Sequence, residues 1–335
     1  MPSALIIGVT GQDGSYLAEL LLEKGYRVVG AVAHGGSRTL DNLGTAHGRV
    51  EIVVTDLTDQ GNLLEVMGGY RPDEAYNFAS QSHLNTSQNE PVVTGDVSGL
   101  GVTRLLEAIR RASPATRFFQ ACSSEMFGRH PKEVPQTEET PFLPWNAYAA
   151  AKLYAHGIVG AYRRSHGLFA CSAILYNHES PRRRPEFVTR KVASGAAMIG
   201  LGLSRELRLG NLEARRDWGF AGDFVRGMWL MLQRAEPDDF LLATGQTHSV
   251  RDLCEAAFSC VGLDYREHVV AEPGDFRPSE AALLVGNPAK ARRLLGWEPE
   301  VSFRELVEMM VKADLESLRN AHGQTPRSSC RGTDR

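Results

Sequence analysis

The stretch Ala4-Leu-Ile-Ile-Gly8-Val-Thr-Gly11-Gln-Asp-Gly14-Ser-Tyr16 opens the chain and decides its fold class. Its apolar start predicts a buried strand, and the amphipathic segment from Tyr16 to Lys24 predicts a helix. Between them, three glycines spaced three apart predict a tight turn with a close backbone approach. The helix that follows offers free N–H groups and a partial positive charge, which suit a pyrophosphate. Because the glycines lie between a strand and a helix, the stretch predicts a dinucleotide-binding site.

Beyond this turn, short apolar runs alternate with longer amphipathic stretches. Such βαβα order requires parallel strands joined by helical crossovers, so it predicts an α/β fold with a doubly wound parallel sheet. The expected elements are Ala4–Gly8, Tyr16–Lys24, Arg27–Val32, Glu51–Val54, Leu63–Met67, Glu74–Phe78, Gly99–Arg111 and Arg117–Ala121.

Composition places the chain among ordinary globular proteins. It has 335 residues, 42% of them hydrophobic, and 37 basic against 40 acidic side chains, a formal net charge of −3. The length favours two structural units. A near-neutral chain has no global field for nucleic acid, and its longest early apolar run is far too short for a membrane span. The five cysteines are scattered without a CxxC pair, which argues against disulfides and a metal site and favours a cytoplasmic location.

The second half is less regular. From Asn177, loops rich in Arg, Pro and Gly separate the helical stretches Phe224–Gln233, Val250–Val261 and Phe303–Leu318. We therefore expect a dinucleotide-binding unit over residues 1–176 and a smaller α/β region over 177–319 that mainly binds substrate. The tail, residues 320–335, has little apolar content, and we expect it to be disordered.

Two groups of side chains indicate catalysis. Tyr148 and Lys152 are four residues apart in the helical stretch Asn146–His156, so they share one helix face, and the ammonium can lower the phenol pKa from about 10 toward neutrality. Ser123-Ser124-Glu125 leaves the end of the strand Arg117–Ala121. Ligands of open α/β sheets bind at the carboxyl ends of strands. The alternative for the Tyr–Lys pair is a solvated surface pair.

Longer strings show a resemblance to a known family. The chain resembles the extended short-chain dehydrogenase/reductases, which have a Rossmann fold, and within them the GDP-mannose 4,6-dehydratase branch. The strings that carry it are Ala4–Tyr16, Asn77-Phe-Ala-Ser-Gln-Ser-His83, Asn177-His-Glu-Ser-Pro-Arg-Arg183, Thr189-Arg-Lys191, Arg216-Asp-Trp-Gly219 and Arg277-Pro-Ser-Glu280.

The resemblance implies roles for individual residues. The catalytic set would be Ser123, Glu125, Tyr148 and Lys152, with Ser123 standing where the family has threonine. The implied cofactor contacts are Gly8, Thr10, Gly11, Gln12, Asp13, Gly14, Arg38, Asp56, Leu57, Phe78, Ala79, Ser80, Gln81, Ser82, Lys152, His178 and Arg183. For Asp56, a turn or capping role is the alternative. The implied substrate contacts are Ser82, Ser123, Ser124, Glu125, Asn177, Val188, Lys191, Arg216, Arg277 and Glu280.

Basic residues gather where a sugar diphosphate would bind. The segment from Arg182 to Arg216 has a local charge of +6. Arginine forks suit phosphate oxygens, and no aromatic ladder favours nucleic acid. For the arginines without an implied role, simple exposure is the alternative; these are Arg182, Arg184, Arg205, Arg208 and Arg215.

The activity that the resemblance implies is a redox-neutral 4,6-dehydration of a GDP-sugar, most simply GDP-mannose. The implied cofactor is bound NADP, and the implied assembly is a homo-oligomer, either a dimer or a tetramer. One departure concerns the cofactor. Family members carry paired arginines after the second strand for the 2′-phosphate of NADP, whereas this chain reads Val32-Ala-His-Gly-Gly-Ser-Arg38. An expected tyrosine is also replaced by Val93. NAD is therefore not excluded.

Three alternatives remain open at this stage. One is a nucleotide-sugar 4-epimerase, and the second is a dehydratase of another sugar nucleotide such as a heptose. The third is a noncatalytic dinucleotide sensor, which would have no need for Glu125 together with Ser123, Tyr148 and Lys152.

Overall fold

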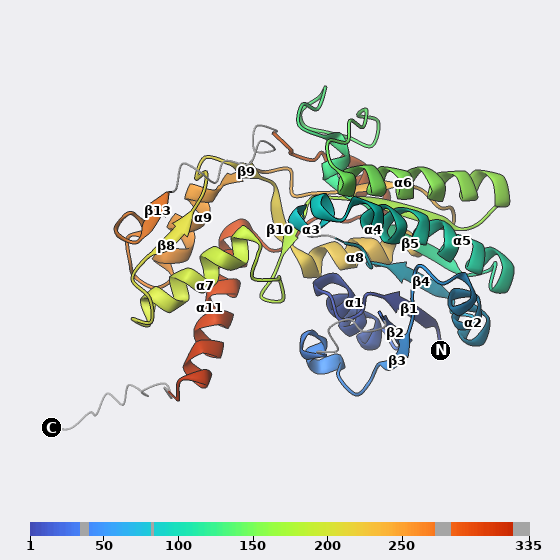
Figure 1. Cartoon of the computed structure of the whole chain (residues 1–335), viewed down its shortest axis with the longest axis horizontal. Coiled ribbons are helices and arrows are strands. Elements are labelled where there is room, and N and C mark those ends of the chain that lie inside the picture. Colours follow the sequence, from blue (N-terminus) through green and yellow to red (C-terminus); the bar gives the residue numbers. More distant parts are fainter. Residues whose placement is uncertain (34–39, 82–83, 272–282, 324–335) are drawn as a thin grey trace.

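A parallel sheet of seven strands forms the centre of the molecule in the computed structural model, which describes residues 1–33, 40–81, 84–271 and 283–323 (Figure 1). The strand order is β11-β6-β5-β4-β1-β2-β3, and neighbouring strands are parallel throughout. The predicted doubly wound fold is confirmed. The strands are β1 (Ser3–Ile7), β2 (Arg27–Val32), β3 (Glu51–Val54), β4 (Glu74–Asn77), β5 (Arg117–Ala121), β6 (Ala170–Leu175) and β11 (Phe240–Leu242).

Helices cover both faces of the sheet. One face carries α1 (Gln12–Glu23), α8 (Ala221–Leu232) and α10 (Ala289–Leu295), and the other carries α2 (Gln60–Tyr70), α5 (Gly101–Ala112) and α6 (Ala147–His166). Helical spacing of the apolar residues explains this: Leu17 and Leu21 bury one face of α1, and Leu105 and Ile109 bury one face of α5. Ahead of α5 lie α3 (Leu84–Asn89), α4 (Pro91–Gly95) and the π-helical turn η2 (Asp96–Leu100).

A second, smaller region packs α7 (Val188–Gly200), α9 (Val250–Ser259) and α11 (Phe303–Ala321) around their own apolar cluster. Ser249 and Ser302 each close a capping box with the acid three residues on, which fixes where α9 and α11 begin. Short strand pairs complete the region: β7 (Asn177–Glu179) with β10 (Trp218–Phe220), β9 (Arg215–Arg216) with β12 (His248–Ser249), and β8 (Leu207–Leu209) with β13 (Val269–Ala271). Short segments of 3-10 helix are η1 (Asp41–Ala46), which is kinked at Gly44, η3 (Ser124–Phe127) and η4 (Tyr265–Glu267).

Several boundaries differ from the sequence-based expectation, and three of these differences affect the site or the division of the chain. α1 begins at Gln12, four residues before Tyr16, because its first turn is polar and carries no apolar period. α11 continues to Ala321, so residues 320 and 321 are helical and were wrongly assigned to the tail; residues 324–335 lie outside the described part. The seventh strand, β11, comes from beyond residue 176 and pairs with β6, so both halves of the chain build the central sheet.

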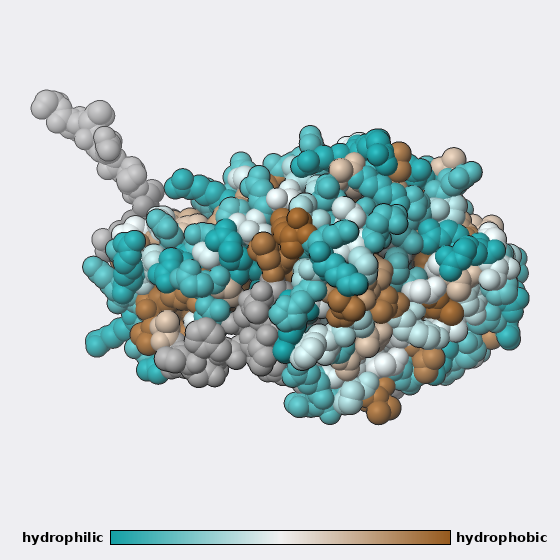
Figure 2. Space-filling model, turned by 90° about the horizontal axis from the view of Figure 1, so that it is seen from above, coloured by the Kyte–Doolittle hydropathy of each residue, from teal (hydrophilic) through white to brown (hydrophobic). Residues whose placement is uncertain are grey.

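The surface is largely hydrophilic on the side seen in Figure 2, where hydrophobic side chains gather in separate patches. Among the exposed hydrophobic residues are Val92, Leu100 and Tyr154, on α4, η2 and α6. In the described ranges, no helix has the length and apolar character that a membrane crossing demands.

Candidate active site

The turn after β1 has the backbone geometry that only glycine provides. Gly8 has φ +87°, and a Cβ there would lie 3.1 Å from the Ala79 nitrogen. At Gly14 a Cβ would lie 2.4 Å from the Gly8 carbonyl oxygen. Gly11 is the N-cap of α1 and offers no side-chain cap, so the first N–H groups of the helix remain available to a ligand.

A buried polar network ties the start of α1 to β7. The Gln12 amide donates to the His178 carbonyl at 2.9 Å and to Asp13 at 3.0 Å. The Nε2 of His178 lies 2.9 Å from an Asp13 oxygen, and its Nδ1 lies 2.7 Å from the Tyr176 carbonyl. Since both partners only accept, both ring nitrogens donate and the ring is an imidazolium.

The electrostatics of this pair agree with that assignment. Burial acts to lower the pKa of His178, but the neighbouring Asp13 carboxylate outweighs it and raises that pKa. Burial acts to raise the pKa of Asp13, but the charge and hydrogen bond of His178 lower it. Both shifts favour the charged forms of the two side chains, and the pair joins the glycine turn to the second half of the chain.

The second wall of the site comes from β5 and α6. Ser123 caps η3, its hydroxyl accepting from the Glu125 N–H at 3.2 Å, and Glu125 lines the cleft. Asn146 caps α6 through the Ala149 N–H at 2.7 Å. This start places Tyr148 and Lys152 one turn apart, and the Lys152 ammonium donates to the Ala121 carbonyl at 2.8 Å.

The expected lowering of the Tyr148 pKa is not found. Burial raises the pKa of Tyr148 to about 12, the Glu125 charge raises it further, and a hydrogen bond from Ser123 works in the opposite direction. The Lys152 nitrogen lies 5.7 Å from the centroid of the Tyr148 ring and is engaged by a backbone carbonyl. Burial lowers the pKa of Lys152 itself. The four-residue spacing predicted the shared helix face but not the desolvation of the phenol, which dominates here.

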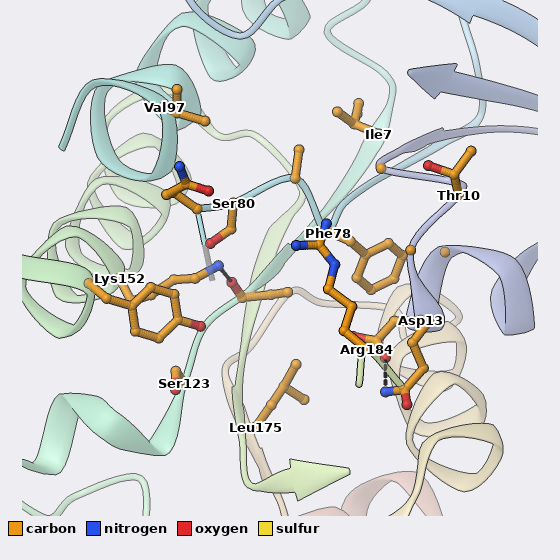
Figure 3. A pocket seen from close by; sticks show the side chains of 18 of the residues that line it. Ile7, Thr10, Asp13, Phe78, Ser80, Val97, Ser123, Lys152, Leu175 and Arg184 are labelled. Atoms are coloured by element: carbon orange, nitrogen blue, oxygen red, sulfur yellow. Dashed lines mark hydrogen bonds between the residues drawn. The ribbon is translucent and has the colours of Figure 1, made fainter. Parts of the chain in front are cut away.

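One cleft of about 940 Å³ joins the two walls (Figure 3). It brings together most residues predicted to bind cofactor and the whole predicted catalytic set: Gly8, Thr10, Gly11, Gln12, Asp13, Gly14, Asp56, Leu57, Phe78, Ala79, Ser80, Gln81, Ser123, Ser124, Glu125, Tyr148, Lys152, Asn177, His178 and Arg183. Asp56 has features of both roles considered for it. It lines the cleft, as a cofactor contact would, and its side chain accepts from the Thr58 N–H and hydroxyl, as a turn residue would.

Other predicted residues lie elsewhere. Of the described residues expected to bind sugar nucleotide, three do not line this cleft: Val188 packs against the apolar cluster of the smaller region, Lys191 is exposed on α7, and Arg216 donates to the Arg215 carbonyl. Four predicted residues, Arg38, Ser82, Arg277 and Glu280, lie outside the described residues.

The sequence analysis assigned no binding role to some residues of the cleft. Asn42, in η1, donates to the Thr10 carbonyl at 3.0 Å and so joins the cleft wall to the glycine turn. Val93, which replaces the expected tyrosine, also lines the cleft with its aliphatic side chain. Arg182, for which exposure was the alternative, is half-buried: it binds both oxygens of Glu19 at 2.8 Å and stacks over Tyr16. Its partners lie more than 160 positions away in sequence, so only the fold reveals them.

Comparison with known proteins identifies the family. The family model described as GDP-mannose 4,6 dehydratase matches residues 5–310. The chain is 45% identical over 325 residues to GDP-mannose 4,6 dehydratase 1 of Arabidopsis thaliana, covering 93% of this chain and 90% of that protein. It is 43% identical to the human GDP-mannose 4,6 dehydratase, covering 94% and 92%.

The chain belongs to the GDP-mannose 4,6-dehydratase family.

Solved structures of related folds agree with the architecture. The UDP-glucose 4-epimerase of Thermus thermophilus, in complex with NAD, has a TM-score of 0.82 at 25% identity, covering 93% of this chain and 98% of that one. The dTDP-glucose 4,6-dehydratase of Bacillus anthracis, in complex with NAD, has a TM-score of 0.83 at 20% identity, covering 96% and 98%. The latter likeness shows the fold alone. The family membership confirms the predicted enzyme class, a hydro-lyase that acts on nucleotide sugars.

Proposed function

We propose that this dehydratase acts on GDP-mannose and forms GDP-4-keto-6-deoxymannose in the cleft between the glycine turn and α6. The observation that carries this proposal is the carboxylate of Glu125, which lines the same cleft as Ser123, Tyr148 and Lys152. A 4-epimerase needs no acid–base group for carbon 5 of the sugar, whereas a 4,6-dehydratase must remove a proton there and help a hydroxyl leave from carbon 6.

A nicotinamide dinucleotide fits the residues present. The glycine turn has no room for a Cβ at Gly14, and the uncapped start of α1 presents N–H groups to a pyrophosphate. Gly11, Gln12 and Lys152 are among the residues that would hold it. Held there, the dinucleotide would supply the hydride chemistry, the removal of hydride from carbon 4 of the sugar and its return to carbon 6.

The side chains of the chain itself move the protons. The phenol oxygen of Tyr148 takes the proton of the 4-hydroxyl, and Ser123 orients that exchange by its hydrogen bond to the phenol. Because burial holds the pKa of Tyr148 at about 12, the loaded site has to stabilise the phenolate before this step. Glu125 then takes the carbon 5 proton and passes it to the leaving 6-hydroxyl, which departs as water. The return of hydride to carbon 6 would require a proton at carbon 5, and the proton that Tyr148 took from the 4-hydroxyl balances it.

We infer NADP as the dinucleotide, with a reduced preference over NAD. The family resemblance supports NADP, and the absence of paired arginines in the sequence after β2 supports the weakened preference. The proposed division of labour follows the two regions, with residues 1–176 binding mainly the dinucleotide and 177–319 mainly the sugar nucleotide. The scattered cysteines support a cytoplasmic site for the reaction.

We also infer a homodimer, with α5 and α6 forming the interface. The two helices pack on each other at one side of the sheet; Leu100, directly before α5, and Tyr154, on α6, expose 48% and 42% of their surface. Large apolar side chains exposed together on neighbouring helices favour association with a second copy.

A product assay tests the proposal. Purified protein is incubated with GDP-mannose and with UDP-, CDP- and dTDP-sugars, and the products are weighed by mass spectrometry. Loss of one water molecule from GDP-mannose is expected. An unchanged mass with inverted carbon 4 would assign an epimerase instead, and dehydration of another sugar nucleotide alone would reassign the substrate.

A further inference from the structure

Three consecutive arginines follow β7, and two of them have carboxylate partners. Arg182 forms its ion pair with Glu19, and Arg183 lies 3.1 Å from Glu179 while its guanidinium stacks over Phe187 at 3.5 Å. These contacts hold the loop against α1 and β7. They also neutralise both charges, so neither arginine brings an uncompensated positive charge to the cleft.

The third arginine is different. Arg184 lines the cleft, yet within the residues that the structure describes its side chain has neither an ion pair nor a hydrogen bond. Figure 3 shows this side chain extending across the cleft toward Phe78, between Lys152 on one side and Thr10 on the other. A guanidinium carries five N–H donors and a permanent charge. Arg184 therefore presents an unused anion-binding group in the middle of the cleft.

The other charged groups near Arg184 are already engaged within the protein, so they leave little positive charge for a bound anion. The first turn of α1 contains the Asp13 carboxylate, whose charge opposes the positive end of the helix, and His178 serves to neutralise that carboxylate. Lys152 donates to a backbone carbonyl at the far wall. Phe78 itself follows β4 and adjoins the glycine turn, since a Cβ on Gly8 would lie 3.3 Å from the Phe78 carbonyl carbon.

We propose that Arg184 is a binding residue for the pyrophosphate of the dinucleotide, which it contacts from the side opposite the start of α1. This inference rests on the proposed use of a dinucleotide. The diphosphate of the sugar nucleotide is the weaker assignment because Lys191 and Arg216, the residues assigned to it, lie outside this cleft. The 2′-phosphate is also the weaker assignment, because Arg184 extends toward Phe78 in the middle of the cleft, whereas that phosphate would lie beyond the end of β2.

The test measures dissociation constants of NAD, NADP and GDP for the full-length protein freed of co-purified nucleotide, by calorimetry. Arg184→Gln removes the charge, Arg184→Lys keeps it, and Arg205→Gln removes an exposed arginine outside the cleft lining. Because Arg184 is exposed and its side chain has no described partner, its replacement is expected to leave the unfolding temperature unchanged.

The expected result is a roughly tenfold weaker binding of both NAD and NADP to Arg184→Gln, since a charge-assisted hydrogen bond is lost, with GDP unaffected. Arg184→Lys should recover part of that loss, and Arg205→Gln should bind all three ligands as the wild type does. A loss confined to NADP would assign Arg184 to the 2′-phosphate, and a loss confined to GDP to the substrate; either overturns the inference. Unchanged constants for all three ligands also overturn it and leave the proposed function intact. A wild type that binds neither dinucleotide would overturn both.

Discussion

Replacing Glu125 by Gln separates the two halves of the proposed reaction. The substitution keeps the size of the side chain but removes the base for carbon 5. Acid–base groups commonly contribute about 10²–10⁴ in rate, so turnover should fall by that factor, or about 3–5 kcal/mol in the barrier. The rate of the first step, the oxidation at carbon 4, should not fall. Because the Glu125 charge raises the pKa of Tyr148, its removal makes the phenol easier to ionise.

Rapid mixing with GDP-mannose should therefore show reduced nicotinamide accumulating on Glu125→Gln, followed by its near-ultraviolet absorbance. Tyr148→Phe deletes the base of the first step and should show none. Ser123→Ala should slow the appearance of reduced nicotinamide, because it removes the hydrogen bond that counteracts the raised pKa of Tyr148. Near-normal turnover by Glu125→Gln would refute the dehydratase mechanism. If that variant inverted carbon 4 without exchanging the carbon 5 hydrogen with deuterated solvent, the epimerase interpretation would replace it.

Four further predictions concern the cofactor, the turn, the ion pair and the assembly. Equilibrium titration should give NADP and NAD affinities within about tenfold of each other, because the arginine pair that would contact the 2′-phosphate is missing and one charge-assisted phosphate contact contributes roughly 1.5–3 kcal/mol. A thousandfold preference for NADP would show that other residues contact the 2′-phosphate. In urea unfolding, Gly14→Ala should lose about 1–3 kcal/mol because its Cβ meets backbone. Gly157→Ala, with open space around its Cβ in α6, should gain up to about 1 kcal/mol, and equal effects of the two would contradict the packing argument. The free energy of unfolding of the wild type should exceed that of His178→Gln, with the full difference present between pH 3.8 and pH 6.5. The difference should shrink as pH rises through the raised pKa of His178, and it should also fall in acid, below 3.8, where Asp13 protonates. A difference that does not change with pH would argue against the ion pair. Light scattering at micromolar concentration should show at least a dimer for the wild type and a shift toward monomer for Leu100→Glu, whereas a monomeric wild type would remove the proposed interface.

Local sequence predicted the first five of the seven sheet strands because each is a short run bounded by turn or polar residues, but it did not predict β6 or β11. β2, β3 and β5 have the predicted limits, and the glycine turn has the predicted geometry. The same local signals placed Tyr148, Lys152 and Glu125 at the ends of neighbouring elements, and the cleft contains all three.

The rest depends on contacts between distant segments. The ion pair of Asp13 with His178 joins positions 165 apart, and the pairing of β11 with β6 crosses from one half of the chain to the other. The pKa of Tyr148 is set mainly by burial, which a four-residue spacing does not report. Asn42 has no periodic or motif signal, and Arg184 has only its place in a basic segment, so only the folded chain shows that both line the cleft.

The return of the chain to add β11 limits how the protein can be divided. All six residues of β6 are buried, and β11 covers the side of β6 away from β5. A fragment ending near residue 176 would leave the backbone groups of β6 open along that side, where another copy could pair with them. Chimeras that exchange the substrate-binding half between relatives would thus have to transfer or preserve residues 240–242, and proteins spliced simply at 176 are expected to aggregate.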